Sequence, residues 1–110
     1  MYAITFDLDT KALEEHYPTP NWRKAYEDIA DFLYDYGFER QQGSVYFGDS
    51  EVTAVTCVTA VQDLSEEYQW LEPFVRDIRM LRIEEFNDLM PAIKKQLRPK
   101  RRTQKLRLVG

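Results

Sequence analysis

Residues 2–9 read Tyr2-Ala3-Ile4-Thr5-Phe6-Asp7-Leu8-Asp9, and this stretch decides the fold of the 110-residue chain. Its even positions carry large apolar side chains, and its odd positions carry small or acidic ones. This period-two alternation predicts a β-strand whose apolar face meets helices. The opposite face is small and then acidic, so we expect it to line an open side of a sheet.

Helical and strand patterns follow in turn. Residues 10–19 form a polar connection with room for a helical turn at residues 11–15. Apolar residues at helical spacing then run from Trp22 to Tyr36. Thr19 suits the N-cap, Pro20 suits the first helical position, and Gly37 suits the position just past the end of the helix. Two short strands are predicted at residues 38–41 and 44–47, joined by a tight turn at Gln42-Gly43.

The second half of the chain repeats the pattern. Asp49 or Ser50 is the expected cap of a second helix, with Glu51 in its first turn. Residues 75–83 read as a strand that follows Pro73, and a short helix over residues 85–96 contains Pro91. Residues 105–109 alternate again and suit an extra strand.

The element order is therefore β-α-β-β-α-β followed by an extension. This order predicts an α+β, ferredoxin-like fold with a four-stranded antiparallel sheet. We expect a ferredoxin-like domain over residues 1–97 and a basic extension over residues 98–110. Both helices would cover one face of the sheet, and a homodimer is the simplest way to cover the other.

The composition suits a soluble globular protein, with 44% hydrophobic and 31% charged residues. No apolar run approaches the roughly 20 residues that span a bilayer, and the first residues lack the features of a signal peptide. The single cysteine, Cys57, lies in an apolar stretch, which favours a buried, inert thiol. We therefore expect a cytoplasmic protein with no membrane contact.

Charge is divided unevenly along the chain. Residues 1–93 carry seven basic and nineteen acidic residues, a net charge of −12, whereas residues 94–107 carry eight basic residues and no acidic one. Three interpretations stay open: a solvated tail, a handle for a phosphate backbone, or a contact with the acidic body of a second copy. Lys100, Arg101 and Arg102 are the tail residues expected to bind such a phosphate backbone.

Asp7 is the main candidate for chemistry. Aspartate is disfavoured in strands, and a carboxylate on a face that meets a partner must be paired, hydrogen-bonded or metal-bound. Two copies of Asp7 in a symmetric dimer would suit Mg²⁺, which activates water and stabilises phosphodiester charge.

Asp9 more simply ends the strand or caps the next turn. His16, the only histidine, lies in a polar stretch and is expected at the surface, which favours a metal route.

Two further segments carry candidates. Residues 76–82 interleave charge with apolar residues, so Asp77 would be a second carboxylate and Arg76 and Arg79 would hold phosphates. Salt bridging across the sheet is the simpler alternative for these residues. Ser44, just after the turn glycine, would hydrogen-bond a phosphate or merely fit the turn.

Residues 6–10, Phe6-Asp7-Leu8-Asp9-Thr10, also resemble the opening Asp-x-Asp motif of haloacid-dehalogenase-type phosphatases. In that family a Thr or Val stands two places after the second aspartate, where this chain has Lys11. The chain is also too short for the doubly wound sheet of such enzymes. A phosphatase is therefore the weaker alternative.

Three segments together resemble the virulence-associated protein D (VapD) family: residues 1–9, residues 37–46 (Gly37-Phe38-Glu39-Arg40-Gln41-Gln42-Gly43-Ser44-Val45-Tyr46) and residues 75–79 (Val75-Arg76-Asp77-Ile78-Arg79). That family is similar to the small ferredoxin-like CRISPR-associated nucleases. The resemblance implies a ferredoxin-like homodimer and, for some members, endoribonuclease activity. Some members are toxins paired with a small antitoxin protein. By position it makes Asp7, Ser44 and Asp77 the catalytic residues.

We therefore expect a metal-dependent endoribonuclease, with Asp7 as the residue that binds Mg²⁺ or another divalent cation. The alternative is a non-catalytic dimeric module that binds nucleic acid or a partner protein. RNA cleavage that depends on Asp7 would favour the first, and salt-sensitive binding without cleavage would favour the second.

Overall fold

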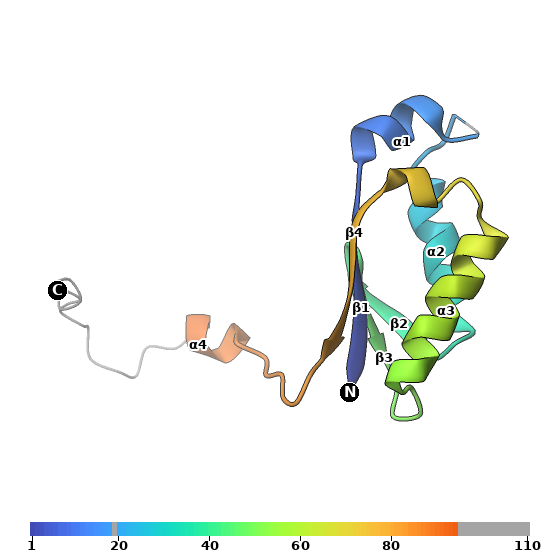
Figure 1. The fold of residues 1–110 in the computed structure, drawn as a ribbon. Helices are drawn as coiled ribbons and strands as arrows, with labels where there is room; N and C mark the ends of the chain where they lie inside the picture. Colours follow the sequence, from blue (N-terminus) through green and yellow to red (C-terminus); the bar gives the residue numbers. More distant parts are fainter. Residues whose placement is uncertain (19, 95–110) are drawn as a thin grey trace, which may run out of the picture.

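The computed structural model describes residues 1–18 and 20–94. Its strands are β1 (Tyr2–Leu8), β2 (Phe38–Gln42), β3 (Val45–Gly48) and β4 (Val75–Arg82). Its helices are α1 (Thr10–His16), α2 (Lys24–Tyr34), α3 (Ala54–Glu67) and α4 (Met90–Lys94), with a short 3-10 turn at Glu72–Phe74. The longer helices α2 and α3 lie on one side of the sheet (Figure 1).

The strands pair in the order β2-β3-β1-β4, and every neighbouring pair is antiparallel. This order confirms the predicted ferredoxin-like α+β fold and places β2 and β4 at the two edges. It differs from the parallel, doubly wound sheet that a haloacid-dehalogenase-type phosphatase would need, so the Asp-x-Asp likeness does not extend to the fold.

β1 follows the predicted alternation. Ile4, Phe6 and Leu8 are buried in a core that includes apolar residues of α2 and α3. Burying each such side chain contributes roughly 1.5–3 kcal/mol, so the pattern fixes which face of β1 meets the helices. On the other face, hereafter the open face, Asp7 is exposed, whereas Ala3 is 0% exposed between its register partners Phe47 and Leu81.

α1 and α2 begin differently from the sequence prediction. Asp9 caps α1, because its carboxylate accepts a hydrogen bond from the Ala12 N–H at 3.1 Å. This confirms Asp9 as a capping residue. α2 begins at Lys24 rather than at Pro20, because the carbonyl of Asn21 accepts from the Lys24 N–H at 3.0 Å and forms a separate turn before the helix. The predicted cap, Thr19, lies outside the described residues.

The predicted cap of α3 is wrong. The capping residue is Thr53, which exchanges hydrogen bonds with Thr56 in a capping box. The Asp49 carboxylate instead accepts from the Glu51 N–H at 2.9 Å, in the turn that brings Val52 into the core. Burial of Val52 therefore delays the start of the helix by several residues.

The β2–β3 hairpin has its turn one residue later than predicted. β2 runs through Gln42, so the turn is Gly43-Ser44, and Gly43 has a φ of +56° that favours glycine. Gly37 ends the preceding helical segment with a φ of +97°, as the sequence predicts. A register shift between Arg40 and Gln42 marks an irregularity in β2 next to the turn.

An arm of residues 83–94 leaves the sheet after β4 and projects away from it (Figure 1). β4 ends at Arg82, one residue before the predicted end, and α4 begins only at Met90, because the Asp88 carboxylate accepts from the Met90 N–H at 2.9 Å at its start. The predicted helix after residue 94 and the strand at residues 105–109 lie outside the described residues.

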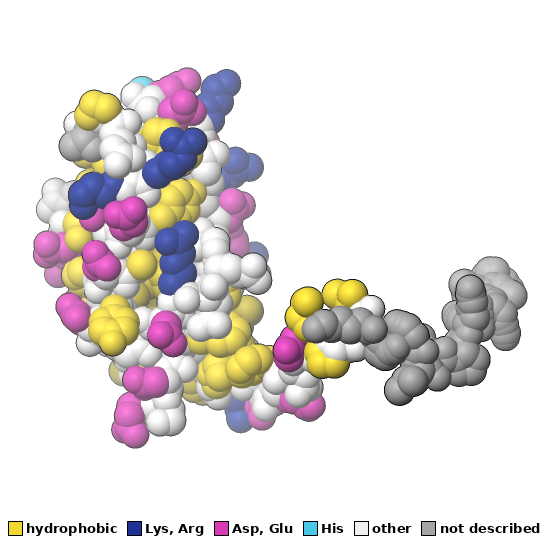
Figure 2. Space-filling view, turned by 180° about the vertical axis from the view of Figure 1, so that it is seen from behind, with side chains coloured by type: hydrophobic (Ala, Val, Ile, Leu, Met, Phe, Trp, Pro, Cys, Tyr) yellow, Lys and Arg dark blue, Asp and Glu magenta, His cyan; other side chains and the backbone are white. Residues whose placement is uncertain are grey.

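The arm carries apolar side chains that are exposed, and Figure 2 shows them gathered on it. These are Phe86, Leu89, Met90 and Ile93. Phe86 also lies edge-on to Phe47 of β3, with 5.3 Å between ring centroids, so the arm leaves across the open face. Within the described ranges, no helix has the length and apolar character required to cross a bilayer.

Candidate active site

Asp7 and Asp77 lie directly opposite each other where β1 ends. The antiparallel register pairs these two residues across β1 and β4. Residues paired in this way have Cβ atoms about 5 Å apart, so their carboxylates are neighbours. Asp7 is exposed and Asp77 is half-buried. The structure thus brings together two residues that the sequence singled out separately.

The two carboxylates have different partners. Both carboxylate oxygens of Asp77 accept a hydrogen bond from Arg79 Nε at 3.1 Å. Within residues 1–18 and 20–94, no side chain forms a hydrogen bond or ion pair with the Asp7 carboxylate. Like charges directly across two strands repel each other, and Arg79 compensates only one of them. Asp7 is therefore the carboxylate available to a further cation.

Arg76 lies at a bulge beside this pair. The register passes from Asp7 opposite Asp77 to Leu8 opposite Val75, which leaves Arg76 as the extra residue of β4. A bulge bends the strand and redirects a side chain. Arg76 is exposed, and its placement next to the two aspartates suits the predicted contact with phosphates.

The β2–β3 turn brings Ser44 to the same end of the sheet. Its carbonyl accepts a hydrogen bond from the Phe6 N–H at 3.0 Å, so the turn is attached to β1 one residue before Asp7. Ser44 is half-buried. The three predicted catalytic residues therefore share one end of β1: Asp7 on the strand, Ser44 on its β3 side and Asp77 on its β4 side.

Three side chains that the sequence did not single out lie near this turn but on the helix-covered face of the sheet, opposite the face of Asp7. Arg40 pairs with Tyr46 across the hairpin, and its guanidinium carbon is 5.9 Å from the centroid of the Tyr26 ring. Burial raises the pKa of both tyrosines, whereas the positive charge of Arg40 acts in the opposite direction. The Tyr46 hydroxyl is buried without a hydrogen-bond partner. The one sequence signal for this cluster is that Arg40 is the only cation in residues 38–47.

Other sequence candidates take no part in the site. His16 is exposed and its Nε2 is 3.8 Å from a Glu15 carboxylate oxygen, which confirms it as a surface residue. Cys57 is 2% exposed, and burial raises the pKa of its thiol, so it is the inert cysteine that was predicted. Lys100, Arg101 and Arg102 lie outside the described residues.

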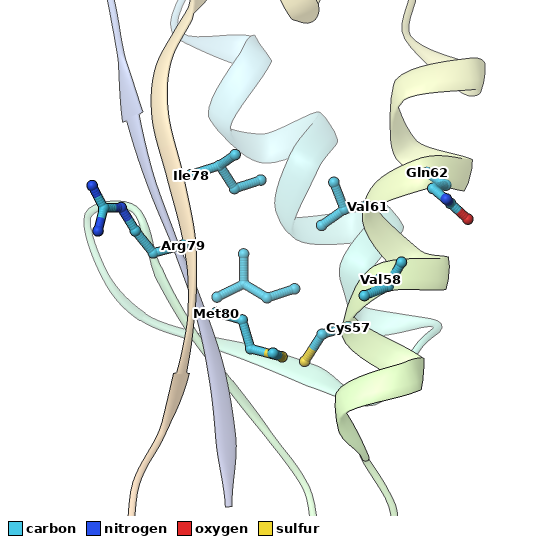
Figure 3. Close-up of a pocket in the computed structure, with 8 residues that line it drawn as sticks. Cys57, Val58, Val61, Gln62, Ile78, Arg79 and Met80 are labelled. Atoms are coloured by element: carbon cyan, nitrogen blue, oxygen red, sulfur yellow. The ribbon is translucent and has the colours of Figure 1, made fainter.

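A separate apolar groove runs between α3 and β4, on the helix-covered side (Figure 3). Ile78 and Met80 point toward α3, whereas Arg79 points to the other side of β4 (Figure 3). The groove is lined mainly by Ile4, Cys57, Val58, Val61, Ile78 and Met80. Because the sheet lies between them, this groove is not part of the carboxylate site.

The carboxylate site fits a hard divalent cation in the chemistry of its donors. Asp7 and Asp77 supply carboxylate oxygens, which Mg²⁺ prefers, and Mg²⁺ commonly uses one or two carboxylates with several waters. Among the described residues, no three His, Cys, Asp or Glu side chains cluster in one chain. Asp7 is the ligand that one copy offers best, since Arg79 already engages Asp77.

Fold and site together define a class: a ferredoxin-like protein with an acidic site at one end of its open face. The family model described as CRISPR associated protein Cas2 matches residues 1–89. Two similar proteins are "Endoribonuclease VapD 2" of Riemerella anatipestifer, 52% identical over 84% of this chain and 99% of its own length, and "Endoribonuclease VapD homolog" of Helicobacter pylori, 55% identical over 86% and 97%. The chain therefore belongs to the Cas2-like VapD family, which confirms the resemblance found in the sequence.

Proposed function

We propose that this protein is a metal-dependent endoribonuclease whose active site is the Asp7 end of the open face, completed by a second copy of the chain. The observation that carries the proposal is the meeting of Asp7, Ser44 and Asp77 at one end of β1. The names of the similar proteins from Riemerella anatipestifer and Helicobacter pylori support RNA cleavage as the reaction.

Different residues of the site would bind the cation and the RNA phosphates. Asp7 would hold the divalent cation, which when bound supplies a Lewis acid and lowers the pKa of a coordinated water. The Ser44 hydroxyl would donate a hydrogen bond to a phosphate oxygen beside Asp7. Arg76 would bind phosphates of the RNA, and so would Arg79 while its Nε donates to Asp77. Both cations would offset the repulsion between RNA and the carboxylates.

The open face also supports the proposed homodimer. One copy provides a single unpaired carboxylate, whereas two copies related by a two-fold axis would provide two. The opposite end of the open face is apolar, and Met1, Leu81 and Phe86 there are exposed by 44–61%. Burying such residues in a symmetric contact stabilises association. A pairing with a small antitoxin protein stays a prediction of the family resemblance.

The test compares wild type with Asp7→Ala on a labelled RNA, with and without EDTA. We expect cleavage to fall at least about 100-fold in Asp7→Ala and in EDTA, since each removes the proposed cation that would stabilise charge on the reacting phosphate. Asp31→Ala, an exposed carboxylate on α2, is the matched control and should cleave like wild type. Equal cleavage by wild type and Asp7→Ala would contradict the proposal. RNA binding by wild type without cleavage would favour the non-catalytic module.

A further inference from the structure

β4 forms one edge of the sheet, and within residues 1–18 and 20–94 no strand pairs with its outer side. The strand order β2-β3-β1-β4 places β1 on its inner side. An edge strand presents a row of unpaired N–H and C=O groups that can pair with a further strand. β4 has eight residues, whereas β2, the other edge, has five. The longer free edge of the sheet therefore belongs to β4.

The two edge strands differ in their surroundings. Four of the five residues of β2 are polar and exposed, and a register shift lies between Arg40 and Gln42. Polar side chains and irregularities of this kind discourage the addition of a strand. β4 also carries charges, but Ile78 and Met80 on its helix-covered side point toward α3 and are only partly covered (Figure 3). β4 is therefore the edge with an apolar surface beside it.

The apolar groove between α3 and β4 follows this edge along most of its length. It shares Val61 and Ile78 with a second apolar hollow, which is lined also by Leu71 and Val75. The two hollows together follow β4 from Val75 to Met80, a length of about 17 Å at the usual rise of a strand. A strand of about five residues, paired with this edge, would place every second side chain in the groove.

Residues 105–109, Lys-Leu-Arg-Leu-Val, have the pattern that this edge requires. In a strand, Leu106 and Leu108 point to one side, and Lys105 and Arg107 point to the other. The family model ends at residue 89, so this segment lies beyond the part of the chain that the model matches. The segment is therefore available for a role particular to this chain.

We propose that residues 105–109 pair with the free edge of β4 in the same chain, as a fifth strand that inserts its two leucines into the groove. Burial of the leucines would remove apolar surface of the groove from water. The two cations of the segment would then lie on the open face. There Asp7 has no partner among the described residues, and Arg79 compensates only Asp77.

The chain is long enough for this return. β4 ends at Arg82 and α4 runs from Met90 to Lys94, so eight extended steps and four helical steps separate Arg82 from Lys94. At about 3.6 Å and 1.5 Å for the two kinds of step, this separation is at most about 35 Å. The chain from Lys94 to Lys105 reaches about 36–40 Å when extended. Lys105 can therefore return to the Arg82 end of β4 wherever the arm points, and the strand can run antiparallel from there.

Charge and connection favour the tail of the same chain over that of a second copy. Residues 1–93 carry a net charge of −12, whereas residues 94–107 carry eight basic residues, so the body attracts the tail. A tethered segment has an effective concentration of about a millimolar, which exceeds the concentration of a second copy in dilute solution. An antiparallel return also needs no crossover of the sheet.

Hydrogen–deuterium exchange of the full chain tests the added strand, because pairing protects the edge N–H groups of β4. Wild type is compared with Leu106→Asp, which would place a charge in the groove. Leu97→Asp is the matched control, since it changes a leucine of the tail outside the pairing segment. We expect the N–H groups of β4 to exchange at least about tenfold faster in Leu106→Asp and at the wild-type rate in Leu97→Asp. Equal rates in wild type and Leu106→Asp, or equal acceleration by both substitutions, overturn the proposal.

A second pair of variants tests the groove from the α3 side. Val58 lines the groove and is 53% exposed, so Val58→Asp should speed the exchange of β4 as Leu106→Asp does. Val55→Asp is its control, because Val55 lies on the same helix and is 73% exposed. Both variants should keep the circular dichroism of wild type, since neither side chain is buried. Wild-type exchange in Val58→Asp would show that the groove does not receive the leucines.

Cysteine cross-linking identifies the chain that supplies the strand. Val58→Cys combined with Leu106→Cys or with Leu108→Cys should form a disulfide within one chain in at least one of the two double variants. The tail variants without Val58→Cys are the control for reaction with the buried Cys57. A mixture of Val58→Cys with either tail variant should stay monomeric on a non-reducing gel. A disulfide dimer from that mixture would place the strand on a second copy and overturn the proposal, as would the absence of a disulfide in both double variants. None of these measurements requires RNA cleavage, so failure of the proposed function would leave them valid.

Discussion

The two ends of the open face differ sharply, although the same strands form both. At the amino-terminal end of β1, Ala3 is fully buried between Phe47 and Leu81. At the other end, Asp7 is exposed opposite Asp77. One end is suited to exclude water, and the other to bind ions. The comparison teaches that a single sheet face can carry a buried apolar end and an exposed acidic end along the length of one strand.

The largest effect is expected from a charge placed at the apolar end. Ala3→Asp would bury a carboxylate without a partner, which destabilises a protein by about 3–5 kcal/mol. Asp7→Ala should change the free energy of unfolding by less than about 1 kcal/mol, because it removes an exposed carboxylate with no partner among the described residues. Urea unfolding of both variants measures the contrast. Equal losses would show that the two ends are not distinct.

Phe86→Ser sharpens the role of the apolar end in association. An aromatic pair contributes about 0.5–1.5 kcal/mol beyond its buried area, so removing the Phe86 ring weakens the apolar patch. We expect the dissociation constant of the proposed dimer to rise about tenfold, equal to about 1.4 kcal/mol, as measured by sedimentation equilibrium. Tyr34→Ser, an exposed aromatic at the end of α2, is the control. An unchanged constant for Phe86→Ser would contradict a dimer contact at the apolar end.

Arg79→Met sharpens the role of the charged end. Without Arg79, both carboxylates of the Asp7–Asp77 pair are free, and their repulsion should cost about 0.2–1 kcal/mol of stability. The Mg²⁺ concentration for half-maximal cleavage should fall about threefold, because the cation relieves that repulsion. Activity titrations with Mg²⁺ test this. A higher requirement for Mg²⁺ would mean that Asp77 has no part in holding the ion.

The smallest effect is expected from a substitution on the helix-covered face, which lies on the other side of the sheet from both ends of the open face. Tyr46→Phe removes a buried hydroxyl that has no hydrogen-bond partner among the described residues. The free energy of unfolding should therefore fall by no more than about 0.5 kcal/mol, and an increase is also consistent with the loss of an unpaired polar group. Thermal unfolding of this variant gives a baseline for the open-face variants. A loss above about 1 kcal/mol would reveal a bound water or another partner for that hydroxyl.

The sequence predicted the strands well, because their signals are local. The alternation of residues 2–8 assigned each side chain of β1 to a face, and the glycines at positions 37 and 43 marked a helix stop and a hairpin turn. Helix starts were less well predicted. Pro20 and Asp49 have the chemistry of helix starts, but the turn at Asn21 and the burial of Val52 moved the true starts onward.

The candidate site was predicted residue by residue but not as an arrangement. No local pattern specifies that Asp7 meets Asp77, since the pairing depends on the register of two distant strands. The bulge at Arg76 and the place of Arg40 beside Tyr26 are also products of packing between elements. These features became visible only with the structure.

The register of β1 against β4 has a consequence for protein engineering. It is held by the apolar residues Ile4 and Phe6 of β1 and Ile78 of β4 on the far side of the sheet, and a slip of either strand by one residue would turn that strand's apolar residues outward. Positions 7 and 77 are thus a pair of substitutable sites on a scaffold that does not depend on them. Histidine at both positions would replace a pair of carboxylates by a pair of imidazoles, whose nitrogen ligands suit Zn²⁺ or Cu²⁺.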